Sequence, residues 1–152
     1  INLELSYKNL SLRVLANGVY GNDIANGNLL QLATPEGISW SNITTAAYNN
    51  AWRPERTSNS YPRIGYTTNG HISMPDWIIE DGSFLRISNI NLSYQFDRIN
   101  IYLSAQNLFT FTGYSGYNPE VTSFLYDGLR NGVDWNGQPS ARKFTIGLNF
   151  NL

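Results

Sequence analysis

The sequence predicts an all-β fold whose long antiparallel strands separate two different media. The last twelve residues alternate polar and apolar side chains, two earlier segments repeat this alternation across tight turns, and long polar segments separate these regions. Because successive side chains of a strand point to opposite faces, each strand can bury one face and expose the other to water. The apolar face of the closing strand consists of Phe144, Ile146, Leu148, Phe150 and Leu152.

The first hairpin is expected over residues 1–7 and 10–21, with a turn at Lys8 and Asn9. A tight turn flanked by alternating residues is typical of a β-hairpin. The apolar positions of this hairpin are Ile1, Leu3, Leu5, Tyr7, Leu10, Leu12, Val14, Ala16 and Tyr20.

The second hairpin is expected over residues 84–96 and 99–111, with a turn at Asp97 and Arg98. In its first strand the apolar residues Leu85 and Ile87 are odd-numbered, whereas Ile90 and Leu92 are even-numbered. This change of phase predicts a β-bulge near Ser88 and Asn89. A fifth strand is expected over residues 141–152, where the chain ends.

Two long polar segments, residues 22–83 and 113–140, connect these strands. Within the first, Ser41 or Asn42 is the expected N-cap of a short helix that ends before Pro54, since the residue before a proline disfavours helix. The expected helix contains Thr44, Ala46, Ala47 and Asn50. Loops this long are uncommon in a compact soluble domain.

These features favour a transmembrane β-barrel over a soluble domain. Charged residues make up 14% of the chain, against about 25% in soluble proteins, and no segment has the ~20 apolar residues of a membrane helix. Short turns on one side and long loops on the other are typical of outer-membrane barrels. Five strands cannot close a barrel, and the chain opens directly in a strand, so we expect the C-terminal part of a longer polypeptide.

The composition argues against catalysis and against nucleic-acid binding. The chain has no cysteine, a single histidine, His71, and a net charge of −1, so thiolate or histidine metal sites, a catalytic triad and a basic nucleic-acid surface are not expected. Glu80, Asp81 and Asp76 could form a glycosidase pair only if two carboxylates converged, and Asp-Gly is ordinary turn chemistry. We therefore expect no enzyme activity and no cofactor.

Several strings resemble the SusC/RagA-type TonB-dependent outer-membrane transporters of Bacteroidota. The longest is Glu80–Ile87 followed by Asn89–Tyr94, and Gln106–Thr110 precedes a second string, Gly113–Glu120. Further matches are Trp52-Arg53-Pro54-Glu55 with Tyr61-Pro62-Arg63, and Asp134 with Pro139 and Arg142. Each string is weak alone, and their common order and spacing make the resemblance specific.

The resemblance implies the last five strands of a barrel of about 22 strands, in the outer membrane of a Gram-negative bacterium, closed by an N-terminal plug that this sequence lacks. It also implies a SusD-like surface lipoprotein as partner, energy from the TonB complex, and import of glycans or peptides; a dimer of transporter–lipoprotein pairs is compatible with it. The expected barrel-assembly signal comprises Thr145, Gly147, Phe150 and Leu152, although the family commonly ends in Phe where this chain has Leu152.

Aromatic residues of the long segments are the candidates for contact with substrate or partner, because their flat faces suit sugar rings and peptide side chains. The alternative is that they fold the loops on themselves or pack against the partner lipoprotein. These candidates are Trp52, Tyr61, Tyr66, Trp77, Tyr114, Tyr117 and Trp135. Tyr7, Tyr94 and Phe96 are expected in an interfacial girdle. Lumen-facing positions are expected at Asn2, Glu4, Arg13, Asn100, Ser104, Gln106, Thr145 and Asn149.

Two other classes remain open from the sequence. A secreted β-sandwich that binds carbohydrate through aromatic loops would also have alternating strands, but its strands usually have about 5 to 6 residues, and the apolar face would be sealed against a second sheet. A glycoside hydrolase fragment would require two converging carboxylates.

Overall fold

The computed structural model describes residues 1–33, 42–58, 61–64, 75–121 and 131–150. The chain divides into two compact units. We call Ile1–Asn22, Gly82–Gly113 and Pro139–Leu152 the wall unit, and Asp23–Asp81 with Tyr114–Gln138 the loop unit. Of the residues singled out above, Ser41, Tyr66, His71 and Leu152 lie outside the described residues.

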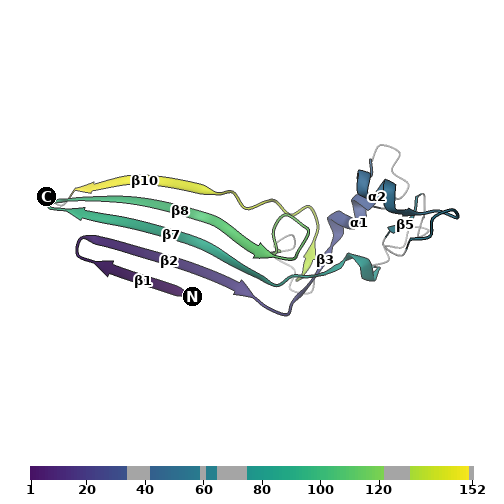
Figure 1. The fold of residues 1–152 in the computed structure, drawn as a ribbon, viewed down its shortest axis with the longest axis horizontal. Helices are drawn as coiled ribbons and strands as arrows, with labels where there is room; N and C mark the ends of the chain where they lie inside the picture. The colour runs from purple at the N-terminus through teal and green to yellow at the C-terminus, as the bar shows by residue number, and fades with distance from the viewer. Residues whose placement is uncertain (34–41, 59–60, 65–74, 122–130, 151–152) are drawn as a thin grey trace. The chain divides into compact units, whose positions relative to one another are not determined.

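The wall unit is one antiparallel sheet of five strands in the order β1-β2-β7-β8-β10. The strands are β1 (Asn2–Tyr7), β2 (Leu10–Val19), β7 (Phe84–Phe96), β8 (Ile99–Thr112) and β10 (Lys143–Phe150). Figure 1 shows them side by side, with the end of β10 at the same end of the sheet as the β1–β2 and β7–β8 turns. The predicted fold class, a sheet of five antiparallel strands, is confirmed.

Two-residue turns close both hairpins. The first residue of each turn has a positive φ, 54° at Lys8 and 48° at Asp97, a conformation that aspartate tolerates better than most side chains. Asn9 connects the two hairpins at this end, because its side chain donates to the carbonyl of Gln95 at 2.7 Å and its own carbonyl accepts from the Gln95 amide at 2.8 Å.

The register separates polar from apolar side chains across all five strands. In antiparallel strands, residues that pair directly project from the same face. One row therefore consists entirely of polar residues: Glu4, Arg13, Asn91, Ser104 and Thr145. The adjacent row, on the opposite face, is entirely apolar: Leu5, Leu12, Leu92, Leu103 and Ile146.

The apolar and polar faces of the sheet differ in the kind of side chain that they expose. The apolar face is exposed in this structure, with Ile146 at 77% and Leu103 at 51% of full exposure. A row of five large aliphatic side chains left open to solvent marks an interaction surface or a membrane contact. On the polar face, Arg13 and Glu4 form an ion pair at 3.1 Å, and both side chains are more than half exposed, so the pair adds little stability.

The predicted change of phase in β7 is confirmed as a bulge. Ile90 pairs with Val14 and Ile87 with Ala16, so Ser88 is an extra residue relative to β2. Val14 and Ala16 lie on the same face of β2, and Ile87 therefore projects from the same face as Ile90. The neighbouring strand β8 compensates at the same level, where Asn107 has a φ of 52°. The paired irregularities keep the apolar face continuous along the full length of β7.

Gly147 makes room for an aromatic ring on the polar face. It pairs with Tyr102 of β8, and a Cβ atom built at Gly147 would overlap the Tyr102 ring. A glycine beneath an aromatic side chain on the next strand is a known way to cover an otherwise bare stretch of backbone. Any larger residue at position 147 must displace the ring.

In the described residues of the loop unit lie a three-stranded sheet in the order β6-β3-β9, a two-stranded sheet and three short helices. Its elements are β3 (Asp23–Asn26), α1 (Gly27–Ala33), α2 (Thr45–Asn50), β4 (Ala51–Trp52), β5 (Tyr61–Arg63), the 3-10 helix η1 (Asp76–Ile78), β6 (Ile79–Asp81) and β9 (Val133–Asp134). β3 pairs antiparallel with β6 and parallel with β9, and β4 pairs parallel with β5. No helix among the described residues is long and apolar enough to cross a membrane.

The structure corrects two expectations about the long segments. The N-cap of the short helix is Thr44, whose hydroxyl accepts from the Ala47 amide at 3.1 Å, and not the expected Asn42, while Ser41 lies outside the described residues. The helix does end before Pro54, as expected. The segments also contain α1 and the sheet around β3, where only turns were expected, because Ile24 and Ile78 bury a small apolar core there.

Arginine substitution at adjacent positions of β10 tests the assignment of the two faces. We expect Ile146→Arg in the complete protein to disfavour membrane insertion by about 2 to 4 kcal/mol, because the apolar row would bring a charge into lipid. Thr145→Arg is the matched control on the polar row. The folded fraction, read from heat-modifiable gel mobility, should fall for the first variant only; equal effects would show that the faces are wrongly assigned.

The contact between Tyr102 and Gly147 predicts non-additive substitutions. Gly147→Ala should destabilise the complete barrel by about 0.5 to 1.5 kcal/mol, the cost of forcing the Tyr102 side chain away from its preferred rotamer. In Tyr102→Ala combined with Gly147→Ala, most of that cost should disappear, since the overlapping ring is gone. Urea titrations of the single and double variants measure the coupling. Additive losses would mean that Gly147 is needed for some other reason.

Candidate functional site

The loop unit is organised around Asn26, which ends β3 and caps α1. Its side-chain oxygen accepts from the Leu29 amide at 3.0 Å, the usual geometry of an N-cap. Its side-chain nitrogen donates to Glu80 at 2.8 Å and to Ser115 at 3.2 Å. Since Asn26 is 2% exposed, these bonds satisfy a polar group that would otherwise be costly to bury.

Glu80 of β6 connects Asn26 to the segment that follows β8 in the chain. One carboxylate oxygen accepts from the Ser115 hydroxyl at 2.7 Å, and the other accepts from the Ser115 amide at 2.8 Å. Hydrogen bonds to a carboxylate are stronger than those between neutral groups. The carboxylate is therefore engaged in holding the loop unit together.

Tyr114 and Asp134 make the second connection. The Tyr114 hydroxyl donates to Asp134 at 2.7 Å, and the other Asp134 oxygen accepts from the Gly137 amide at 3.1 Å. Both side chains are buried, at 5% and 2% exposure. Burial, the hydrogen bond to Asp134 and the negative charges of Asp134 and Glu80 all raise the pKa of Tyr114 well above its usual range.

These bonds unite segments that are far apart in the sequence. Asn26, Glu80, Ser115, Tyr114 and Asp134 come from both long segments, and three of the four strings that carry the family resemblance contribute a residue. Asn136 adds a further link, since its amide donates to the side chain of Asn28 at 2.8 Å. We call these seven residues the polar network of the loop unit.

The structure brings two of the aromatic candidates together. The rings of Tyr61 and Trp77 are tilted by 47° with centroids 6.2 Å apart, a favourable arrangement for an aromatic pair. Both side chains are partly exposed, as is Trp52 of β4. These three residues keep aromatic surface open to a binding partner.

The remaining aromatic candidates differ in accessibility. Tyr114 is buried and bonded to Asp134, so its side chain supports the loop fold and presents no surface for contact, contrary to its selection as a contact residue. Trp135 is 38% exposed and lies against Gly27, where a Cβ atom would overlap its ring. Tyr117 is 72% exposed. Contact by the accessible residues stays a prediction.

The expected assembly-signal residues occupy the last described strand. Thr145 and Gly147 project from the polar face of β10, and Phe150, at 64% exposure, projects from the apolar face. Tyr7, Tyr94 and Phe96 are also exposed, close to the two short turns. The positions fit a girdle and a closing strand, and recognition by an assembly machinery stays a prediction.

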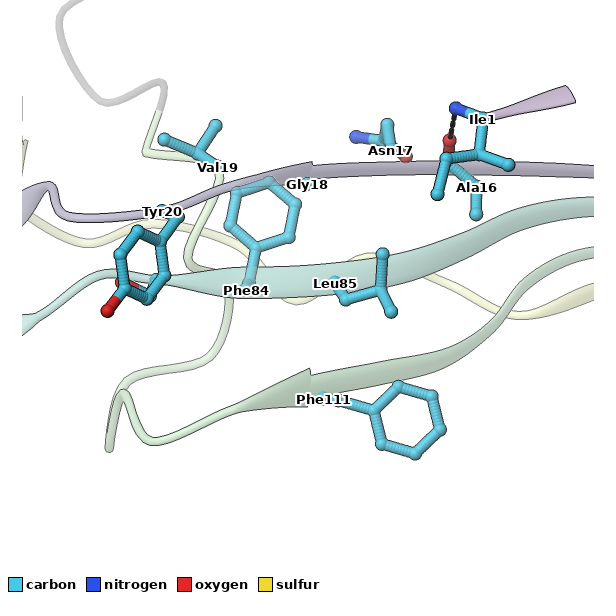
Figure 2. A pocket seen from close by; sticks show the side chains of 10 residues that line it. Ile1, Ala16, Asn17, Gly18, Val19, Tyr20, Phe84, Leu85 and Phe111 are labelled. Carbon is cyan, nitrogen blue, oxygen red and sulfur yellow. Dashed lines mark hydrogen bonds between the residues drawn. The ribbon is translucent and has the colours of Figure 1, made fainter.

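A cavity of about 540 Å³ lies within the wall unit, along the flank of β2. Figure 2 shows its lining near Ile1, whose nitrogen donates to the Ala16 carbonyl at 2.7 Å. Gly18, Val19, Leu85 and Phe111 are among its lining residues. Most of the lining is apolar surface of the sheet, and we do not assign it to a small ligand.

The described part of the chain offers no cluster of three or more His, Asp or Glu side chains that could hold a metal ion. Two of its carboxylates, those of Glu80 and Asp134, are engaged in the polar network.

Comparison with known proteins identifies the family. The chain is 31% identical over 162 residues to TonB-dependent receptor P3 of Formosa agariphila, which covers 97% of the chain and 15% of that receptor. It is 32% identical over 121 residues to the TonB-dependent receptor SusC of Bacteroides thetaiotaomicron, covering 71% of the chain and 11% of SusC. The chain belongs to the SusC/RagA-type TonB-dependent receptors. No family model matches it.

Solved structures agree with the fold of this receptor segment. The RagAB peptide transporter superposes with a TM-score of 0.76 at 24% identity, over 97% of the chain and 16% of the solved chain. The segment thus spans about a sixth or less of the length of the proteins that it matches. Receptors of this family are outer-membrane β-barrel proteins, so the exposed apolar face of the wall unit is the face that meets lipid.

The polar network was not anticipated from the sequence. Glu80, Ser115 and Asp134 occur in strings that resemble the family, yet nothing in their spacing shows that they meet. Asn26 carried a usable signal, since an asparagine followed by Leu29, Leu30 and Ala33 at helical spacing favours a capped helix. Contacts between residues 26, 80, 115 and 134 depend on tertiary structure alone.

Loss of the Tyr114 hydroxyl should open the loop unit. Tyr114→Phe removes a donor to a buried carboxylate, which costs about 1 to 3 kcal/mol, and limited proteolysis of the complete receptor within the loop unit should accelerate accordingly. Tyr117→Phe, at an exposed position, is the control. Because the pKa of Tyr114 is raised, its contribution is present below about pH 10 and is lost at higher pH. That alkaline loss should be absent in Tyr114→Phe; identical alkaline behaviour would contradict the role of Tyr114.

Proposed function

We propose that the complete receptor imports glycans or peptides across the outer membrane, with energy from the TonB complex and with a SusD-like lipoprotein as partner. The observation that carries the proposal is the pair of adjacent rows in the wall unit, one wholly polar and one wholly apolar. A wall with this division suits a water-filled lumen surrounded by lipid. The family membership supports the same reading.

In this proposal the wall unit contributes its polar face to the lumen. Glu4, Arg13 and Ser104 would brace or line the interior against the plug, which belongs to another part of the receptor. Uncharged amides and hydroxyls dominate this face, including Asn89, Asn91, Asn100 and Gln106. Such groups can donate and accept hydrogen bonds with water or with a moving plug surface, and they add no charge to the lumen wall.

The loop unit would lie on the extracellular side and carry the contacts with substrate or lipoprotein. The two short turns lie at the end of the sheet where β10 ends, as expected for the periplasmic side of a barrel with short periplasmic turns. The long segments begin at the opposite ends of β2 and β8. Among the described residues, the aromatic candidates that keep accessible surface for such contacts are Trp52, Tyr61, Trp77, Tyr117 and Trp135.

The alternatives from other functional classes have less support. A soluble β-sandwich requires its apolar face to be covered, whereas Ile146, Leu148 and Phe150 are each more than half exposed. A glycoside hydrolase requires two free converging carboxylates, whereas Glu80 accepts bonds from Asn26 and Ser115. We propose that the receptor carries out no bond chemistry on its cargo.

Uptake by cells tests the proposal. In the native host, deletion of the gene for the complete receptor should abolish accumulation of one class of fluorescently labelled oligosaccharide or peptide, and a plasmid copy should restore it. Inactivation of TonB should abolish the same uptake, because transport through a plugged barrel needs the energy of the inner membrane. The control is a labelled nutrient small enough for general porins, whose uptake should not change. Full uptake without the receptor or without TonB would refute the proposal.

A further inference from the structure

A short turn of the loop unit places two arginines side by side. The chain leaves β4 at Trp52, and the backbone of Arg53 then pairs with that of Arg56 through two hydrogen bonds, each of 3.0 Å. Residues that pair in this antiparallel manner lie about 5.5 Å apart at their Cα atoms and project to the same side. Pro54 fixes its own φ within the turn. We call residues 53–56 the arginine turn.

The position of Arg53 is defined by Tyr48 of α2. Its guanidinium lies over the Tyr48 ring, 4.9 Å from the centroid, and donates to the Tyr48 carbonyl at 3.3 Å. The remaining N–H groups of the guanidinium fork are available for another acceptor, because a guanidinium has five donors. Arg53 is thus held in place before any ligand arrives, which reduces the entropy lost on binding.

Two like charges directly opposite each other are unfavourable. Within the described residues, the ion pair of the structure joins Arg13 to Glu4, and none involves Arg53, Arg56 or Arg63. Residues 51–58 and 61–64 carry these three arginines and one carboxylate, that of Glu55. The turn therefore has an excess of positive charge that an anion would relieve.

Besides Tyr48, which contacts Arg53, further aromatic residues belong to the strands next to the arginine turn. Trp52 precedes Arg53 in the chain and pairs in register with Arg63 of β5, which begins with Tyr61. Tyr61 in turn contacts Trp77. Trp52, Tyr61 and Trp77 are all partly exposed. Aromatic faces next to guanidinium groups match a sugar ring that carries an acidic substituent, because the ring can stack while the acid binds the guanidinium fork.

We infer that the arginine turn and its aromatic neighbours bind an acidic oligosaccharide through its carboxylate or sulfate groups. The inference rests on the proposed function, since it names the substrate class of the importer. Arg53 and Arg56 supply paired donors to the anionic oxygens, Arg63 adds positive charge beside Trp52, and Trp52 or the Tyr61–Trp77 pair supplies the stacking surface. Charge complementarity favours this occupant over a neutral glycan.

Binding measurements on the complete receptor test this inference. Isothermal titration would use tetragalacturonate as the carboxylated probe, a sulfated carrageenan tetrasaccharide as the sulfated probe, and cellotetraose as the neutral probe. We expect at least one acidic probe to bind more tightly than cellotetraose. Arg53→Gln combined with Arg56→Gln should weaken acidic-probe binding by about tenfold or more, since hydrogen bonds between charged groups are lost, and should leave any cellotetraose binding unchanged.

Arg98→Gln is the matched control, because it removes an exposed arginine from the short turn of the β7–β8 hairpin in the wall unit. It should leave binding of every probe unchanged. The single variant Arg56→Gln gives a second measurement should the double variant fold poorly, and Arg56→Lys should restore only part of its affinity, because lysine keeps the charge and loses the fork.

Three results would overturn the inference. The first is a wild-type receptor that binds neither acidic probe more tightly than cellotetraose, and the second is an unchanged affinity in the arginine variants. The third is loss of a co-purified lipoprotein from the double variant, which would assign the arginine turn to an acidic protein surface. If one of these results is found and cells still import a neutral glycan or peptide through the receptor, the inference fails and the proposed function stands. If the receptor supports no TonB-dependent uptake at all, the proposed function itself is refuted.

Discussion

The wall unit depends on keeping two media apart across a single layer of backbone. Most pairs in the sheet join residues of like polarity, so that the row through Glu4 and Thr145 is polar while the row through Leu5 and Ile146 is apolar. A one-residue slip in any strand would exchange its two faces. In a barrel wall, that error would bring charged and amide groups into hydrocarbon. The register of the sheet is thus fixed by solvation more than by any one contact.

The loop unit is held together by a different kind of interaction. Its apolar core is small, with Ile24 and Ile78 as its most deeply buried large side chains. The polar network compensates by joining distant segments through Asn26, Glu80 and Asp134. Such networks are directional, and they specify one arrangement of the loops where apolar packing alone would allow several. A rigid base of this kind suits a surface whose aromatic and arginine side chains must be presented in fixed positions.

The sequence was sufficient to predict the wall unit, since the period of two, the two-residue turns at Lys8 and Asp97 and the phase change at Ser88 are all local signals. It was insufficient for the loop unit. The contacts of Tyr114 with Asp134 and of Glu80 with Ser115 join residues separated by 20 and 35 positions, and no local pattern marks them. Tyr114 was accordingly grouped with exposed aromatics, although its hydroxyl and its ring are both enclosed.

The bulge at Ser88 has a consequence for interpreting substitutions along β7. From Ile90 to Phe96 the even-numbered residues lie on the apolar face, whereas before Ser88 the odd-numbered residues Leu85 and Ile87 do. A strict alternation extended from Ile90 back to the start of β7, without the extra residue, assigns these earlier positions to the wrong side of the wall. Substitutions at Leu85 and Arg86 would then be read with their environments reversed, and a lipid-facing change would be mistaken for one that alters the lumen.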